Sequence, residues 1–314
     1  MKILYAGSPE AACETLKILY ENQKSYDFEI AGVLSNPPTA KGRHHDLIPT
    51  PVAAFALEKG LPVFTPEHLD ASARESIFPL KADLLVCFAY GHIFGPKFLE
   101  MFPMGGINLH PSLLPKYRGC TPVNAAILNG DKETAVTIQT LGLKMDEGDI
   151  LAQEIVELNG SENAQSLLDY CAKSGAKLIC DLLKLSNQKG KLPEGKAQSG
   201  EASYTGIITK DDGRINWHES AKTIEAKIRA YYPEPGCWCM EKGQPLRIVK
   251  ALLSAQDMEG QPGQVLSFIK NQGIAVKTAD GVLLVQELQR QGKKSLNYKD
   301  FMNGARDFVG TVLE

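Results

Sequence analysis

The chain has 314 residues, of which 43% are hydrophobic and 23% are charged, and its formal net charge at pH 7 is −3. This length predicts two domains, with room for a sizeable core in the larger one, and the composition is ordinary for a soluble globular protein. No apolar run approaches the ~20 residues of a membrane-spanning helix. The N-terminus lacks the apolar length of a signal peptide, so we expect a cytoplasmic protein without a membrane partner.

Strand-like and helix-like runs alternate over the first 185 residues. We predict strands over 2–6, 28–34, 61–64, 83–88, 105–109, 135–140 and 150–156, and helices from Glu10 to about Asn22 and over 52–59, 121–129 and 163–185. The run 83–88 is continuously apolar, which is typical of a parallel strand buried on both faces. The alternation predicts an α/β fold with a Rossmann-like, doubly wound and mostly parallel sheet in a domain over 1–185.

The second part of the chain has a different pattern. Residues 186–202 are polar and rich in Gly, Lys and Glu, which is typical of a linker. Short strand-like runs follow over 246–250, 263–268, 273–277 and 282–288. Their spacing predicts a small β-barrel in a domain over 203–314.

Charge and cysteine usage limit the possible partners. Residues 1–185 carry 16 Lys and Arg against 22 Asp and Glu, or −6, whereas residues 186–314 carry 18 against 15, or +3. The positive second part is a weak indication of a polyanionic partner. The seven cysteines are odd in number and scattered, which favours reduced thiols. The six histidines lack the spacing of a metal site, so we expect no metal.

Asn108 and His110 are the most informative pair of residues. They stand two apart at the end of the predicted strand 105–109, so both side chains leave the strand on one face. Open α/β sheets bind ligands at the carboxyl ends of their strands. With a carboxylate from the loop around Asp146, the pair forms a cluster of an oxyanion donor, a titratable imidazole and a group that orients its proton. Alone, each of these residue types is more often structural.

The sequence around this pair resembles the signature of the formyltetrahydrofolate-dependent formyltransferases. The matching pattern is Asn-x-His-Pro-Ser-Leu-Leu-Pro at 108–115, then Arg118-Gly119, then Asp146-x-Gly148. Within that family, four later segments resemble the methionyl-tRNA formyltransferases: 203–217, 228–236, 288–294 and 300–304. The resemblance therefore covers nearly the whole chain, and it implies that the C-terminal domain is of the oligonucleotide-binding type.

The resemblance implies transfer of a formyl group from 10-formyltetrahydrofolate to the α-amino group of methionine on initiator tRNA, for translation initiation. It makes Asn108, His110 and Asp146 the catalytic residues, and we expect a monomer. It implies folate contacts, through main-chain groups and pocket walls, by Val86, Phe88, Tyr90, Gly91, Ile93, Ser112, Leu113, Leu114, Pro115, Leu141 and Met145. It suggests tRNA contacts by Lys41, Arg43, Lys210, Arg229, Lys293 and Lys294.

The polar loop 36–46 matches the tRNA-contacting loop of the family in place and length. It departs from the family pattern at Pro38-Thr39-Ala40, where Asp-Arg-Pro is usual, and at His44-His45-Asp46, where Gly-Lys-Lys is usual. The loop is therefore less basic than the family pattern. We still expect Arg43 to contact a phosphate.

Four other functions compete with this interpretation. A nicotinamide enzyme needs three glycines in its first turn, where this chain has Gly7 alone. A sugar-nucleotide formyltransferase shares the catalytic trio, but the segments around Lys210 and Lys293 argue against it. A tRNA-binding protein without catalysis would be free to lose the trio, and a folate hydrolase should lack the basic C-terminal domain.

Overall fold

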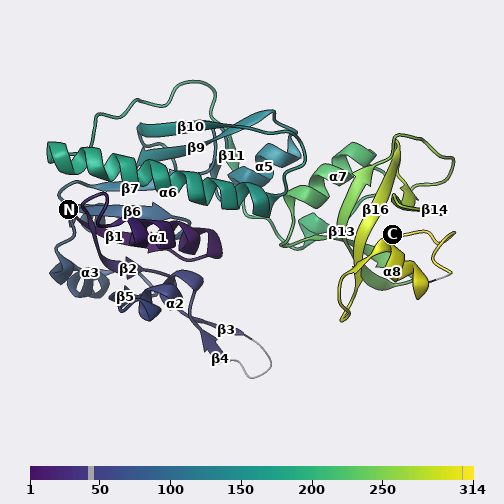
Figure 1. Cartoon of the computed structure of the whole chain (residues 1–314), viewed down its shortest axis with the longest axis horizontal. Coiled ribbons are helices and arrows are strands. Elements are labelled where there is room, and N and C mark those ends of the chain that lie inside the picture. The colour runs from purple at the N-terminus through teal and green to yellow at the C-terminus, as the bar shows by residue number, and fades with distance from the viewer. Residues whose placement is uncertain (42–45, 306) are drawn as a thin grey trace. The chain divides into compact units, whose positions relative to one another are not determined.

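The computed structural model describes residues 1–41, 46–305 and 307–314 (Figure 1). The chain divides into two compact units. The first unit contains residues 1–122, 133–157 and 168–205, and the second contains 123–132, 158–167 and 206–314. None of the helices in the described ranges is long and apolar enough to cross a membrane.

A seven-stranded sheet forms the centre of the first unit, in the order β10-β9-β7-β6-β1-β2-β5. The strands are β1 (Lys2–Gly7), β2 (Glu29–Leu34), β5 (Val63–Phe64), β6 (Leu84–Phe88), β7 (Gly106–His110), β9 (Glu133–Thr140) and β10 (Ile150–Glu157). Five adjacent strands of this sheet run parallel to one another: β7, β6, β1, β2 and β5. Strands β9 and β10 are antiparallel to their neighbours. The predicted doubly wound, mostly parallel sheet is confirmed.

The helices of the first part of the chain are α1 (Glu10–Asn22), α2 (Pro51–Glu58), α3 (Ala71–Ile77), α4 (Pro96–Leu99), α5 (Pro122–Leu128) and α6 (Ala164–Lys189). Thr50 and Asp70 cap α2 and α3 by accepting main-chain N–H bonds from Ala53 and Ala73. Figure 1 shows α1 and α6 side by side, where the Thr15 hydroxyl donates to the Ala172 carbonyl over 3.0 Å. The short helices α3 and α4 were not predicted, and a hairpin of β3 (Thr39–Lys41) and β4 (Asp46–Ile48) stands apart from the main sheet.

Helix α6 packs against one face of β7 and leaves the other face uncovered by this helix. A Cβ at Gly175 of α6 would overlap the Leu109 side chain, so helix and strand touch there. Neighbouring residues of a strand point to opposite faces. Asn108 and His110 therefore face away from α6.

The segment that we interpreted as a linker, 186–202, is partly ordered against the first unit. Helix α6 continues into it as far as Lys189. Lys196 then exchanges two main-chain hydrogen bonds with Ile150 of β10, 2.9 and 2.8 Å long. Farther on, β11 (Tyr204–Thr205) pairs in parallel with β8 (Arg118–Gly119).

The second unit contains a six-stranded antiparallel sheet in the order β12-β13-β16-β15-β14, with β17 beside β16. Its elements are η2 (Asp211–Gly213), α7 (Ala221–Ala230), β12 (Cys237–Glu241), β13 (Gln244–Leu253), β14 (Val265–Ile269), β15 (Gly273–Lys277), β16 (Val282–Arg290), β17 (Leu296–Asn297) and α8 (Tyr298–Asn303). Four of these strands were predicted, and β12 and β17 were not. Cys237 and Cys239 of β12 point into the core, where both are buried.

Residues 311–314 connect the two edges of this sheet. Met240 of β12 and Glu314 exchange two main-chain hydrogen bonds, 2.7 and 3.0 Å long. On the other side, the Val265 N–H of β14 donates to the Thr311 carbonyl over 2.8 Å. Because the same segment bonds to both edge strands, the sheet closes into a small barrel.

Candidate active site

The sheet register brings polar side chains together around the carboxyl end of β7. Asn108 lies opposite Gln139 of β9, and His110 lies opposite Thr137. Opposite residues in a sheet project to the same face. All four side chains therefore share the face of β7 that α6 leaves free.

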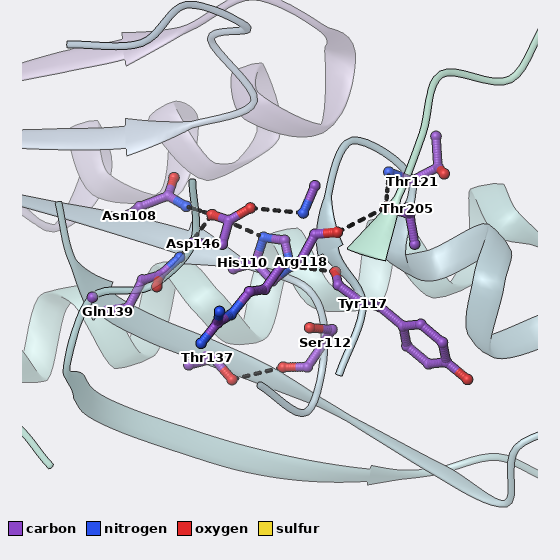
Figure 2. Close-up of polar contacts among 12 residues, drawn as sticks. Asn108, His110, Ser112, Tyr117, Arg118, Thr121, Thr137, Gln139, Asp146 and Thr205 are labelled. Atoms are coloured by element: carbon purple, nitrogen blue, oxygen red, sulfur yellow. Dashed lines mark hydrogen bonds and ion pairs between the residues drawn. The ribbon is translucent and has the colours of Figure 1, made fainter. Parts of the chain in front are cut away.

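Asp146 completes this cluster from the loop between β9 and β10 (Figure 2). Its Oδ1 accepts hydrogen bonds from Gln139 Nε2 at 2.8 Å and Asn108 Nδ2 at 3.3 Å, and it lies 3.5 Å from His110 Nδ1. Its Oδ2 accepts the Gly119 N–H at 2.9 Å. Asp146 itself has a φ of 54°, a left-handed conformation that is uncommon outside glycine. The three residues predicted to be catalytic thus meet around one carboxylate.

His110 has an oxygen atom facing each of its ring nitrogens. Its Nε2 lies 2.9 Å from the Tyr117 carbonyl, which only accepts, so the proton of a neutral ring lies on Nε2. The Nδ1 lone pair then points toward Asp146. Burial lowers the pKa of His110 below its ordinary value, against the opposing effects of the Asp146 charge and the Tyr117 carbonyl. His110 is therefore mainly neutral at pH 7, with Nδ1 ready to accept a proton.

The loop between β7 and β8 supplies the partners of His110 and Asp146. Thr137 of β9 donates its hydroxyl to the Ser112 carbonyl, and the Ser112 hydroxyl donates to the Lys116 carbonyl, each over 2.7 Å. Tyr117 follows in a left-handed conformation with a φ of 59°. This fixed path aims the Tyr117 carbonyl at the imidazole and the Gly119 amide at the carboxylate.

Gly119 occupies a position that no other residue fits without strain. Its φ is +105°, and a Cβ there would overlap the Thr205 carbonyl oxygen. We expect Gly119→Ala to lower the free energy of unfolding by about 1–3 kcal/mol. It should also lower catalytic activity, because the amide that binds Asp146 must move. Urea unfolding and an activity assay test this prediction.

Gly206→Ala is the matched control, because a Cβ at Gly206 meets no atom within 4 Å. We expect this control to behave as wild type in both measurements. If Gly119→Ala behaved as the control does, the close approach of Gly119 to Thr205 would be irrelevant to the site.

The residues predicted to contact folate fall into three groups by exposure. Buried are Val86, Phe88, Tyr90, Ser112, Leu114 and Pro115, and half-buried are Leu113 and Leu141. Gly91, Ile93 and Met145 are exposed. Ile93 follows the end of β6, and Met145 directly precedes Asp146. Ile93 is 67% exposed and Met145 is 49% exposed, so each presents apolar surface.

Five of the six residues predicted to contact tRNA lie in the described ranges. Lys210, Lys293 and Lys294 are exposed. Arg229 instead donates to the Glu225 carboxylate at 2.6 Å and to the Glu162 carbonyl at 2.9 Å, which occupies its guanidinium within the protein. The main chain of Lys41 ends β3, and Arg43 lies outside the described residues, as do His44 and His45.

Sequence reasoning missed Gln139, the Gly119 amide and the Tyr117 carbonyl as partners of the trio. A signal for Gln139 exists in the sequence. Thr137 and Gln139 are polar residues two apart in the otherwise apolar run 135–139, and such a pattern marks buried side chains that need partners. Main-chain groups of a loop leave no such signal. Across the described ranges, no group of three or more His, Cys, Asp or Glu residues is arranged to hold a metal ion.

Comparison with known proteins places this site in a family context. The model of the formyl transferase family matches residues 1–183, and that of the formyl transferase C-terminal domain matches residues 207–306. The methionyl-tRNA formyltransferase of Treponema denticola is 42% identical to the chain and covers 98% of each chain. That of Syntrophus aciditrophicus is 35% identical over the full length of this chain and 99% of its own.

Among solved structures, HypX from Aquifex aeolicus in complex with tetrahydrofolic acid has a TM-score of 0.67 at 17% identity. It covers 98% of this chain, whereas the chain spans about half of HypX (48%). At this identity the likeness shows a common fold.

Proposed function

Because the chain belongs to the formyl transferase family, and matches its methionyl-tRNA formyltransferases over nearly its full length, we infer its reaction. It transfers the formyl group of 10-formyltetrahydrofolate to the α-amino group of methionine on initiator tRNA, which gives the formylated tRNA for translation initiation. We propose that Asn108, His110 and Asp146 carry out this transfer. The observation that supports this assignment is that the side chains of Asn108 and His110 both face the Asp146 carboxylate.

The donor supplies the formyl carbon and a nitrogen that must gain a proton to leave. Ile93 follows the end of β6, and Met145 precedes Asp146 in the chain. We propose that their exposed apolar side chains contact a ligand that joins flat apolar rings to a reactive polar group. We propose that the main chain around 86–93 and the loop 112–115 bind the same ligand. These segments suit the ligand chemically, because ligand pockets combine apolar walls with a few polar groups.

His110 is the residue that we propose for the proton transfers of this reaction. The α-amino group of methionine has a pKa near ~8, so a useful fraction is neutral and nucleophilic at pH 7. We propose that His110 Nδ1 accepts the proton that this amine loses as it attacks, and holds it for the leaving nitrogen. Asp146, 3.5 Å from Nδ1, stabilises the imidazolium that forms.

Asn108 stabilises the negative charge that develops on the formyl oxygen during attack. Its amide has two N–H donors, and one of them is directed to Asp146 Oδ1. The other remains for the substrate oxygen. A fixed donor of this kind needs no reorganisation when the charge appears, which is the basis of oxyanion stabilisation.

The decisive experiment measures formyl transfer from 10-formyltetrahydrofolate to methionyl initiator tRNA. Methionyl elongator tRNA and a uridine-diphosphate amino sugar serve as competing acceptors in parallel reactions. We expect transfer to the initiator tRNA alone. Transfer to the sugar instead would identify a sugar-nucleotide formyltransferase on the same fold.

We propose that the second unit binds tRNA phosphates through Lys293 and Lys294, which are exposed in the turn between β16 and β17. The double variant Lys293→Ala/Lys294→Ala should raise KM for tRNA and leave kcat nearly unchanged. Removal of one phosphate-binding lysine should also reduce the slope of log affinity against log salt by about 0.7–0.9. Steady-state kinetics at several salt concentrations measure both effects. Lys270→Ala, which removes one exposed lysine of the same unit, is the control for the loss of a surface charge. An unchanged slope would contradict the proposed role of these lysines.

We further propose that the chain works as a monomer in the cytoplasm. Two observations support this: one chain supplies the whole catalytic cluster, and all seven cysteines are free thiols. Light scattering coupled to size-exclusion chromatography should give the mass of a single chain, 34.3 kDa. A stable dimer would contradict the proposal.

A further inference from the structure

The segment 196–205, called the strap below, contacts both loops of the active site. It begins at Lys196, which is bonded to Ile150 of β10, and ends at β11, which pairs with β8. Part of it lies in the polar stretch that composition alone assigns to a linker. Two of its side chains, those of Gln198 and Ser203, form hydrogen bonds with the loops that surround the catalytic residues.

Gln198 is the residue of the strap that reaches the Asp146 loop. Its Nε2 donates to the main-chain carbonyls of Asp146 and Gly148, each over 2.8 Å. Its Oε1 accepts from Arg118 twice, from Nη2 at 2.8 Å and from Nε at 3.1 Å. One side chain thus ties the loop that carries Asp146 to the loop that carries the partners of His110.

Ser203 supports the other half of the catalytic pair. Its hydroxyl accepts the Tyr117 N–H at 2.9 Å, and its carbonyl accepts the Arg118 N–H at 2.9 Å. Tyr117 is the residue whose carbonyl binds His110 Nε2. The strap therefore fixes Tyr117 through Ser203 and Asp146 through Gln198, on the two sides of His110.

Asp146 needs such support because of its conformation. Its φ of 54° belongs to a left-handed region that is unfavourable for a non-glycine residue and persists only where surrounding contacts enforce it. The bond from Gln198 acts on the carbonyl of this same residue. Loss of that bond removes the contact that holds the main chain of Asp146, while the bonds from Asn108, Gln139 and Gly119 act on its carboxylate.

We propose that Gln198 is a positioning residue, which holds the Asp146 carboxylate against His110 by fixing the Asp146 loop to Arg118. This inference rests on the proposed function, since it assigns Gln198 a part in the same formyl transfer. Gln198 acts through Asp146, so its removal should affect the rate of the chemical step more than the binding of tRNA or folate.

The test replaces Gln198 in the full-length protein. Gln198→Ala removes the side chain, and Gln198→Met keeps its length and volume but removes its hydrogen bonds. For both variants we expect kcat to fall by about 10- to 100-fold, because small displacements of a catalytic group have effects of this size. KM for methionyl-tRNA should stay within about threefold of wild type, since Gln198 does not contact the proposed tRNA-binding lysines.

A second readout separates positioning from general structural support. The charge of Asp146 raises the pKa of His110, so displacement of Asp146 should lower that pKa in both variants. Histidine NMR titration of the protein without substrates measures this shift directly. Two other titratable groups lie close by: Cys87, whose pKa burial raises to about 12 so that it stays neutral, and Glu147, which pairs with Arg118 at 3.2 Å.

Gln188→Ala is the control, because Gln188 is an exposed glutamine near the end of α6. We expect it to match wild type in kcat and in the His110 titration. The proposal is overturned if kcat of both Gln198 variants stays within twofold of wild type, or if kcat falls while the His110 pKa is unchanged. If the wild-type protein transferred no formyl group, the proposed function would fail, whereas the NMR comparison would still test whether Gln198 positions Asp146.

Discussion

Formyl transfer by the His110→Ala protein should be about 10³- to 10⁴-fold slower than by wild type, since a positioned acid–base group contributes up to this amount. The expected effect is large because no other described side chain can take over at the same place. Asn108 and Gln139 carry amides without acid–base function at neutral pH, and Asp146 already accepts three hydrogen bonds. Single-turnover kinetics at saturating donor and tRNA measure the effect on the chemical step alone.

The matched control for this variant is His68→Ala, which removes an exposed histidine. It should retain wild-type kcat. Circular dichroism and thermal unfolding of His110→Ala should show a folded protein. Near-normal turnover by folded His110→Ala would eliminate His110 as the proton acceptor.

Asp146→Asn should slow the transfer by about 10²- to 10⁴-fold. The substitution keeps the size of the side chain but removes the negative charge opposite His110 Nδ1. The remaining influences on His110 are then burial, which lowers its pKa, and the Tyr117 carbonyl, which raises it. The His110 pKa should therefore fall further, and the imidazolium that forms during the reaction loses its stabilising partner.

The control for this variant lies on the same loop. Asp149 is exposed, so Asp149→Asn removes the same charge from the loop without changing the His110 environment. The two variants should differ in kcat by at least about 100-fold, the lower end of the contribution of a positioned acid–base group. A decrease below tenfold for Asp146→Asn would make Asp146 a structural residue.

The features that could be predicted from the sequence are those with a local pattern. The continuous apolar run of β6 and the spacing of two between Asn108 and His110 both follow from strand geometry, and both appear in the structure. The meeting with Asp146 depends on a loop, and was predicted from the resemblance as well as from the residue types. Strand periodicity alone does not predict that Asp146 lies beside His110, whereas the family pattern does.

The parts that could not be predicted depend on contacts between distant segments. Gln198 stands in a polar stretch whose composition is that of a linker, and its role becomes visible only when Arg118 and the Asp146 loop lie beside it. Short elements such as α4 and β17 are held by their surroundings and carry too few residues for a periodic signal. The closing segment 311–314 likewise has no strand-like length of its own.

Closure of the barrel by residues 311–314 has a consequence for biosynthesis. The outer edge of β12 bonds to Glu314, and roughly 70 residues separate that strand from the closing segment, so at ~5–20 residues per second the ribosome needs several seconds to supply the partner. During that interval the nascent chain presents an unpaired strand edge, the kind of surface that recruits other chains. The C-terminal unit is thus exposed to misassembly until its last residues are made, and we expect a chaperone to protect it during that interval.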